Sequence, residues 1–158
     1  MKKLLSLGLL ALAISACRPE PFKEIGAPYS VITGINGNWD LEMVEVEDRS
    51  FPQWETLEFT DFFLDNPVSI NFNSADNSYA ISANSLDGLP FSSLNGTYAF
   101  DDPEYPENLY LISTDGDTST VGMGNMVRAI DPNMIFEELK SKCDAEYARY
   151  IYTFKRSN

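Results

Sequence analysis

Apolar and polar residues alternate through much of the chain, and this period of two restricts the fold more than any other feature. Val68, Ile70 and Phe72 alternate with polar residues, and a similar run follows at 79–83. Successive side chains of a β-strand point to opposite faces, so each run predicts a strand with one buried face. Because only Ser, Ala, Asp and Asn lie between the strand ends, residues 68–83 are predicted to form a β-hairpin with a short turn.

Further extended segments follow, separated by compact turn signals. They lie at 97–101, 109–114, 119–130 and 149–155. Asn95-Gly96 and Asp115-Gly116 are read as turns, because both pairs favour the backbone angles of tight connections. We therefore predict a mostly β chain that forms a single antiparallel barrel or a curled meander sheet.

The first alternating segment changes its parity midway. Trp39, Leu41 and Met43 share one parity, whereas Val44 and Val46 take the other. A β-bulge produces such a switch and bends the strand, as happens at barrel corners. A strand that is buried on both faces is the alternative.

Residues 132–147 fit two structures equally well. Asp131-Pro132 is a suitable N-cap and first turn, and apolar residues recur at every fourth position through the segment, as in an amphipathic helix. In the other interpretation, residues 134–140 form a strand and 141–144 its turn. The sequence therefore leaves open one short helix near 132–147.

The N-terminus has the pattern of a bacterial lipoprotein signal. Lys2 and Lys3 precede an apolar run, and Ile14-Ser15-Ala16 leads directly to Cys17. The run is long enough for export but too short to span a bilayer. We expect residues 1–16 to be removed as a signal peptide.

Lipid on Cys17 is then expected to hold the protein at a membrane, because a diacylglycerol group with a further acyl chain such as palmitate anchors stably. Residues 17–33 are rich in Pro, Gly and charge and are predicted to be a flexible tether, and residues 34–158 the folded domain. Arg18, rather than aspartate, follows the cysteine. By analogy with Gram-negative sorting, this favours the outer membrane, with the domain facing the surface or the periplasm.

Charge and residue types exclude several functions. The net charge of −13 becomes −15 once Lys2 and Lys3 leave with the signal peptide. Such a charge repels the phosphates of nucleic acids, so no nucleic-acid partner is expected. The chain has no histidine, which excludes His-dependent nucleophilic catalysis and most catalytic zinc sites. We expect no enzyme, no catalytic residue, no cofactor and no metal.

Cys143 has no intramolecular partner if lipid occupies Cys17. An unpaired cysteine commonly behaves as a small apolar residue. We therefore expect Cys143 to be buried in the core.

Several motifs resemble those of a known family. Gly37-Asn38-Trp39 resembles the Gly-x-Trp signature of lipocalin-like barrels. A longer series resembles a family of Bacteroidetes lipoproteins of unknown function with a lipocalin-like fold: Asp61-Phe62, Pro90-Phe91, Gly96-Thr97-Tyr98, Asp101-Asp102-Pro103-Glu104-Tyr105-Pro106, and Cys143 followed by residues 150–154. The resemblance implies a lipocalin-like β-domain from about residue 34 onward, with Trp39 as a structural residue across the barrel floor. It supplies no catalytic residues.

Carboxylates cluster at Asp101, Asp102 and Glu104, where they offer oxygen ligands for Ca²⁺ or an acid–base pair. We favour a solvated turn stiffened by two prolines, because neighbouring carboxylates on such a turn point apart. The same interpretation applies to Asp115-Gly116-Asp117.

The aromatic-rich segment 51–63 is the candidate ligand site, since a first long loop lies over the open mouth of such a barrel. Trp54, Phe59 and Phe62 are the residues expected to contact an apolar or amphipathic ligand, in a cavity at the barrel end. Alternatively, the segment plugs the barrel with its own aromatic side chains.

These observations predict an outer-membrane-anchored, non-enzymatic lipoprotein whose barrel binds a small apolar or amphipathic ligand. The alternative is an accessory interaction module at the cell surface, with a side-chain-filled barrel and an outer face that docks an envelope protein. The volume left inside the barrel distinguishes the two.

Overall fold

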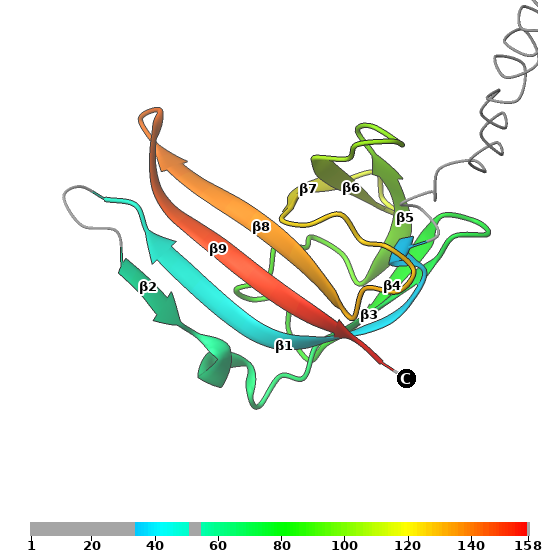
Figure 1. Ribbon diagram of the computed structural model, residues 1–158, viewed down its shortest axis with the longest axis horizontal. Helices are drawn as coiled ribbons and strands as arrows, with labels where there is room; N and C mark the ends of the chain where they lie inside the picture. Colours follow the sequence, from blue (N-terminus) through cyan, green and yellow to red (C-terminus); the bar gives the residue numbers. More distant parts are fainter. Residues whose placement is uncertain (1–33, 51–54, 158) are drawn as a thin grey trace, which may run out of the picture.

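A computed structural model describes residues 34–50 and 55–157, and strands dominate this part of the chain (Figure 1). The strands run in the order β1 (Gly37–Asp48), β2 (Glu55–Glu58), β3 (Ser69–Asn73), β4 (Ser78–Ser82), β5 (Asn95–Phe100), β6 (Asn108–Ser113), β7 (Thr118–Met123), β8 (Asn133–Lys142) and β9 (Ala145–Arg156). A single 3-10 turn, η1 (Thr60–Phe63), follows β2. The predicted mostly β, antiparallel architecture is confirmed.

The sheet closes on itself because β1 pairs with strands from both ends of the chain. Its first residues pair with β3, from Gly37↔Phe72 to Asp40↔Ser69, and its whole length from Trp39 onward pairs with β9. Eight strands therefore form a closed barrel, and β2 is an additional strand on the outer half of β1. This architecture is compatible with a lipocalin-like fold.

Two local predictions about strands are confirmed. The hairpin at 68–83 is β3 and β4, and the turn between them ends at Asn77, whose φ is 54°. The parity switch in β1 is a bulge, because the register with β9 shifts between Leu41 and Met43. Trp39 and Val44 both face the core as a result.

The helix interpretation of residues 132–147 is wrong, and the strand interpretation is confirmed. β8 and β9 pair from Asn133↔Lys155 to Lys142↔Ala145. Met134 and Phe136 are fully buried, so the period of two governs this segment. Apolar residues at every fourth position favour a helix locally, but this preference is overridden because β8 pairs with β9 along the entire length of β8.

One prediction of a turn and one prediction of a buried side chain are also wrong. Asn95-Gly96 is not a turn but the start of β5, where a Cβ on Gly96 would lie 2.0 Å from the carbonyl oxygen of Ile112. Glycine is needed there for close strand approach. Cys143 is exposed in the turn between β8 and β9, not buried, because this two-residue connection lies beyond the core.

The barrel floor is built around Trp39, which is fully buried. Its ring N–H donates to the carbonyl of Ile35 at 2.7 Å. The Arg156 guanidinium lies 4.1 Å from the ring centroid and donates to the carbonyls of Asn36 and Gly34. The start and the end of the described domain are thus held together at one end of the barrel.

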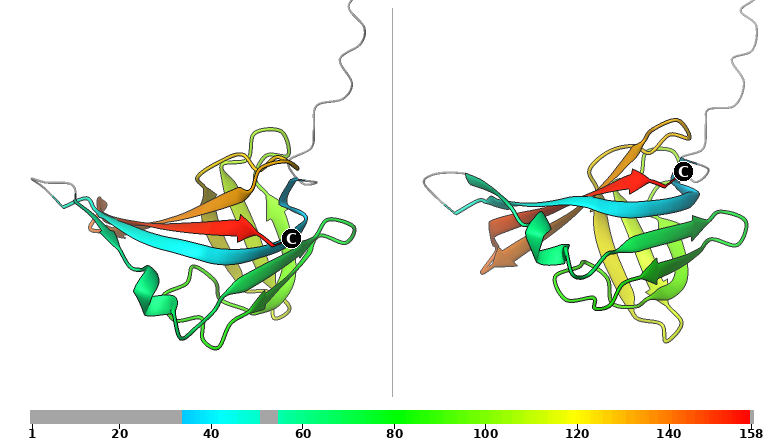
Figure 2. Two further views of the ribbon diagram at one scale, coloured as in Figure 1. Left: turned by 60° about the horizontal axis from the view of Figure 1, so that its bottom comes forward. Right: turned by 90° about the horizontal axis from the view of Figure 1, so that it is seen from below.

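The longest strands continue past the opposite end, the mouth, as a projecting sheet (Figure 2). We call this the sheet extension; it comprises residues 43–48, 55–58, 137–142 and 145–151. Only two residue pairs join β7 to β8, Gly122↔Glu137 and Met123↔Phe136, so β8 leaves the barrel wall early. The inner face of the extension overlooks the mouth.

Candidate functional site

Aromatic side chains occupy the barrel interior. Phe72 contacts Tyr98 edge to face, with ring centroids 5.2 Å apart, and Phe136 lies 5.5 Å from Phe154. Phe72 and Phe136 connect the two pairs at 6.5 Å. These rings come from strands on different sides of the barrel. The interior is therefore a packed core, as in the alternative interpretation, and a binding site is to be sought outside it.

Residues 83–94 lie across the mouth, and of the segment 51–63 the structure describes residues 55–63, among which Phe63 is buried against the core. Phe91 in the mouth loop, residues 83–94, is buried and packs on Phe136 at 6.3 Å. The hydroxyl of Tyr152 donates to the carbonyl of Gly88 at 2.9 Å, and burial raises the pKa of Tyr152 above its ordinary value. The core-facing ring of Tyr152 thereby fixes the loop across the barrel end.

A pocket of about 190 Å³ lies beside this loop, at the base of the sheet extension. Its walls come from four separate segments: β1, the end of β2 with η1, the mouth loop and β9. The lining residues are Val44, Phe59, Phe62, Phe63, Gly88 and Tyr150. The lining is therefore apolar and mainly aromatic, and we call this hollow the mouth pocket.

Hydrogen bonds hold η1 against β1. The amide of Phe59 donates to the carbonyl of Val44 at 2.7 Å, and the amide of Val44 donates to the Thr60 hydroxyl at 3.1 Å. The start of η1 is thus tied to Val44 by two hydrogen bonds. The position of Phe59 and Phe62 follows from this attachment.

Asn66 ties the other end of η1 to the mouth loop. Its carboxamide oxygen accepts from the amides of Asn84 and Ser85, and its nitrogen donates to the Ser85 carbonyl at 2.8 Å. Gly88 has a φ of +77°, and a Cβ there would lie 3.4 Å from the rings of Phe62 and Phe63. The pocket walls are therefore fixed to one another.

The residues predicted as ligand contacts are partly placed by the structure. Phe59 and Phe62 line the mouth pocket, whereas Trp54 lies outside the described residues. Sequence reasoning missed Val44, Gly88 and Tyr150. No local signal marks them, because they meet only when four distant segments pack together.

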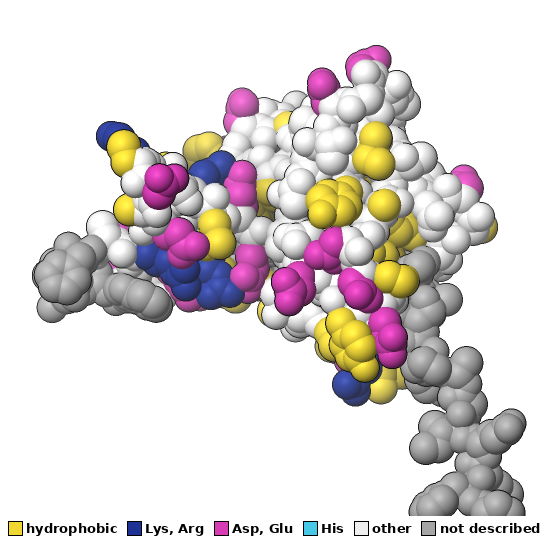
Figure 3. Space-filling model, turned by 90° about the horizontal axis from the view of Figure 1, so that it is seen from above, with side chains coloured by type: hydrophobic (Ala, Val, Ile, Leu, Met, Phe, Trp, Pro, Cys, Tyr) yellow, Lys and Arg dark blue, Asp and Glu magenta, His cyan; other side chains and the backbone are white. Residues whose placement is uncertain are grey.

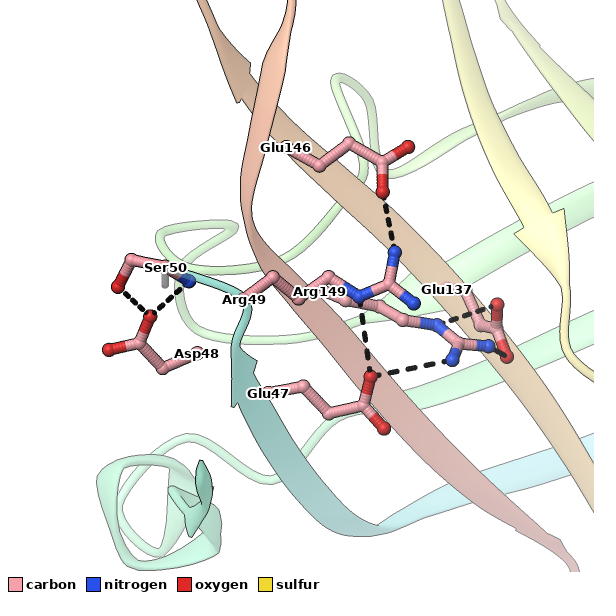
Figure 4. A network of polar contacts seen from close by, with 7 residues as sticks. All are labelled: Glu47, Asp48, Arg49, Ser50, Glu137, Glu146 and Arg149. Atoms are coloured by element: carbon pink, nitrogen blue, oxygen red, sulfur yellow. Dashed lines mark hydrogen bonds and ion pairs between the residues drawn. The ribbon is translucent and has the colours of Figure 1, made fainter. Parts of the chain in front are cut away.

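A network of charged residues lies on the outer face of the sheet extension (Figure 4). Arg149 donates to Glu137 at 3.0 Å and pairs with Glu47 at 3.4 Å, and Arg49 pairs with Glu146 at 2.5 Å. The hydrogen bond to Glu137 raises the pKa of Arg149 above its ordinary value. This network spans β1, β8 and β9, so it helps to order a sheet that has no core on its outer side.

The carboxylates of the 101–107 loop organise their own turn. Asp101 accepts from the amides of Glu107 and Asn108, both at 3.1 Å, and Asp102 accepts from the amides of Glu104 and Tyr105. These bonds hold the pKa of Asp101 and of Asp102 below the ordinary value. In the described ranges no group of three or more His, Cys, Asp and Glu side chains is arranged to hold a metal ion.

A second hollow of about 300 Å³ lies beside β5, lined by Asn77, Tyr98, Ala99, Phe100 and Pro103. The Tyr98 hydroxyl is buried and has no hydrogen-bond partner among the described residues. Phe100, at this hollow, packs against the core. The mouth pocket has the more exposed aromatic residues, and we regard it as the candidate site.

No protein-family model matches this chain, and no curated protein matches it either. Within residues 34–50 and 55–157, none of the helical segments has the length and hydropathy needed to cross a membrane.

Proposed function

We propose that this protein is a non-enzymatic binding protein, anchored at the outer membrane by lipid on Cys17, whose mouth pocket takes an apolar or amphipathic ligand. The observation that carries the proposal is a preformed aromatic pocket outside a filled barrel. Ligand sites are typically concave, apolar and formed in advance of binding. The fixed walls of the mouth pocket have these properties.

Apolar side chains around the pocket are unusually exposed. Phe62 is 66% exposed and Leu64 is 72% exposed, and Leu57 and Phe59 nearby are also largely open to solvent. Single exposed apolar residues are common, but a continuous group of them marks an interaction site. The exposed group lies along one segment, residues 57–64, and adjoins the pocket.

Anchoring and family membership are supported by the sequence. The basic start, the short apolar run and Cys17 match a lipoprotein signal. The barrel and the position of Trp39 at its floor are compatible with the Bacteroidetes lipoprotein family that the motifs resemble. Localisation at the outer membrane, on either of its sides, is part of the same proposal.

A second candidate function is an accessory interaction module. The filled interior favours it, because the ligand volume of a lipocalin-like barrel is occupied by side chains. At about 190 Å³ the mouth pocket is also smaller than the roughly 300–1,000 Å³ of most small-molecule sites. In this version a side chain of an envelope protein enters the pocket.

Both versions place the contact at the mouth, and an uncharged fluorescent dye tests that location. The full chain carrying Cys17→Ser, which lacks the lipid-bearing thiol, should enhance the emission of Nile red. Phe62→Ser should weaken dye binding by about tenfold, as expected for a central apolar contact. Ile130→Ser, at a residue that is 87% exposed near the floor, is the matched control and should leave binding unchanged. No enhancement, or equal losses in both variants, would refute the proposal.

A further inference from the structure

Charge is segregated along the chain. Between Ser50 and Val127 there are twelve Asp and Glu residues and no Lys or Arg. This stretch supplies β2 to β7, η1 and the mouth loop, so most of the barrel wall contributes only negative charge. In Figure 3, Lys and Arg side chains gather on the sheet extension, whereas Asp and Glu predominate over the barrel on that face.

Two of these carboxylates belong to residues next to the lining of the mouth pocket. Asp61 lies in the same 3-10 turn as Phe62, and Asp87 precedes Gly88. Both carboxylates are exposed. The residues beside the aromatic lining therefore carry negative charge in both η1 and the mouth loop.

Basic residues near the pocket are already paired. Lys140 lies 6.0 Å from the ring centroid of Tyr150, and its ammonium group bonds to Glu138 at 2.6 Å. Arg149 is on the opposite face of the extension, between Glu47 and Glu137. Neither basic side chain forms an ion pair with the carboxylates of η1 or the mouth loop.

The size of the pocket limits what enters it. Its volume of about 190 Å³ suits one apolar group, whereas the exposed apolar residues continue past it along 57–64. An occupant that covers this whole surface is thus longer than the pocket and inserts one anchor. A peptide with an apolar anchor side chain has this shape.

We infer that the mouth pocket receives an apolar side chain from a cationic, amphipathic segment of a partner protein. The inference rests on the proposed binding site at the mouth and adds the chemistry of the occupant. The anchor fills the aromatic pocket, and flanking Lys or Arg side chains lie against Asp61 and Asp87. Complementary charge of this kind accelerates association and rejects acidic competitors.

The probe is a short fluorescein-labelled peptide in which Phe and Leu alternate with Lys. Two matched peptides replace either every Lys by Glu or every Phe and Leu by Ser. Fluorescence anisotropy with the full chain carrying Cys17→Ser should show binding of the first peptide only. Raising the salt to about 0.5 M should weaken that binding by about tenfold, because screening shortens the range of exposed charges.

Variants locate the contact. Phe62→Ser should weaken binding of the Lys peptide by at least about tenfold, and Asp61→Asn with Asp87→Asn by about fivefold, as exposed charge pairs contribute modestly. Glu104→Gln, in the loop at the floor end, is the control for lost charge and should have no effect. Equal effects of Glu104→Gln and the mouth variants would indicate attraction by net charge alone and overturn the inference.

The outcomes separate the two proposals. If Nile red binds at the mouth but the Lys and Glu peptides bind equally, the cationic-partner inference fails and the proposed function stands. If the Ser-containing peptide binds as well as the Lys-Phe peptide, no apolar anchor side chain is needed and the inference also fails. If Nile red does not bind, the proposed function itself fails.

Discussion

At the scale of single residues, Trp39 and Arg156 do most to define the barrel floor. The ring of Trp39 combines full burial, a hydrogen bond to Ile35 and a guanidinium over its face. Burial of a large aromatic side chain contributes several kcal/mol, and the polar contacts satisfy the ring N–H in the core. One residue near the start of the domain therefore connects to the last residue of β9.

Replacement of Trp39 by alanine should destabilise the domain by about 3–5 kcal/mol, as for other buried aromatic residues. Urea titration followed by far-UV circular dichroism measures the change. Tyr105→Ala, at a residue that is 65% exposed, is the control and should change stability by less than about 0.5 kcal/mol. A loss below about 1 kcal/mol for Trp39→Ala would contradict the role of this residue at the floor.

At the scale of elements, the β8–β9 hairpin shows how pairing overrides local preference. Its turn consists of Cys143 and Asp144, which have φ values of 51° and 62°. Two consecutive left-handed residues are the geometry of a type I′ turn, for which Asn-Gly is preferred. The strained turn is retained at the tip of the sheet extension, where the side chain of Cys143 is exposed.

The double substitution Cys143→Asn with Asp144→Gly should therefore stabilise the domain by about 1 kcal/mol, because it relieves left-handed strain at two positions. Thermal unfolding under reducing conditions measures the effect as a higher Tm. Lys142→Ala, one residue before the turn, is the control and leaves the turn angles unchanged. An unchanged or lower Tm in the double variant would mean that the turn is not strained.

At the scale of the whole molecule, the floor and the mouth pocket lie at opposite ends of the barrel. The chain enters the described domain at the floor, where Arg156 bonds to Gly34, and the mouth pocket lies at the other end. In the proposed lipoprotein, the chain that leads from Cys17 therefore enters the domain at the end of the barrel away from the pocket. The acidic wall, which repels anionic headgroups, is consistent with a pocket that turns toward a partner.

Membrane attachment should depend on Cys17 alone. Cys17→Ser should abolish labelling by radioactive palmitate and release the protein from the membrane fraction, because two or more acyl chains are needed for stable anchoring. Cys143→Ser removes the chain's other thiol and should leave labelling intact. Labelling that persists in Cys17→Ser, or is lost in Cys143→Ser, would show that the anchor lies elsewhere.

Much of the fold was predictable because alternation is a local property. The strands at 69–73 and 78–82, the bulge in β1 and the final strand all follow from side chains that alternate between two faces. The candidate site was predictable only in part. Phe59 and Phe62 are conspicuous in the sequence, but Tyr150 and Gly88 join them through contacts that no local pattern records.

The sequence by itself thus determined the strand content, the antiparallel class, the acidic surface and the pattern of a lipid anchor, since each depends on neighbouring residues or on composition. Tertiary structure decided that the segment 132–147 forms a strand, a turn and the start of the next strand instead of a helix, that residues 83–94 lie across the mouth and that the pocket lies outside the core. These features depend on the pairing of β1 with β9, which joins residues more than a hundred positions apart. Such pairing and packing stabilise the chain only once the barrel has closed. Their free energy outweighs the weak conformational preferences of a short segment.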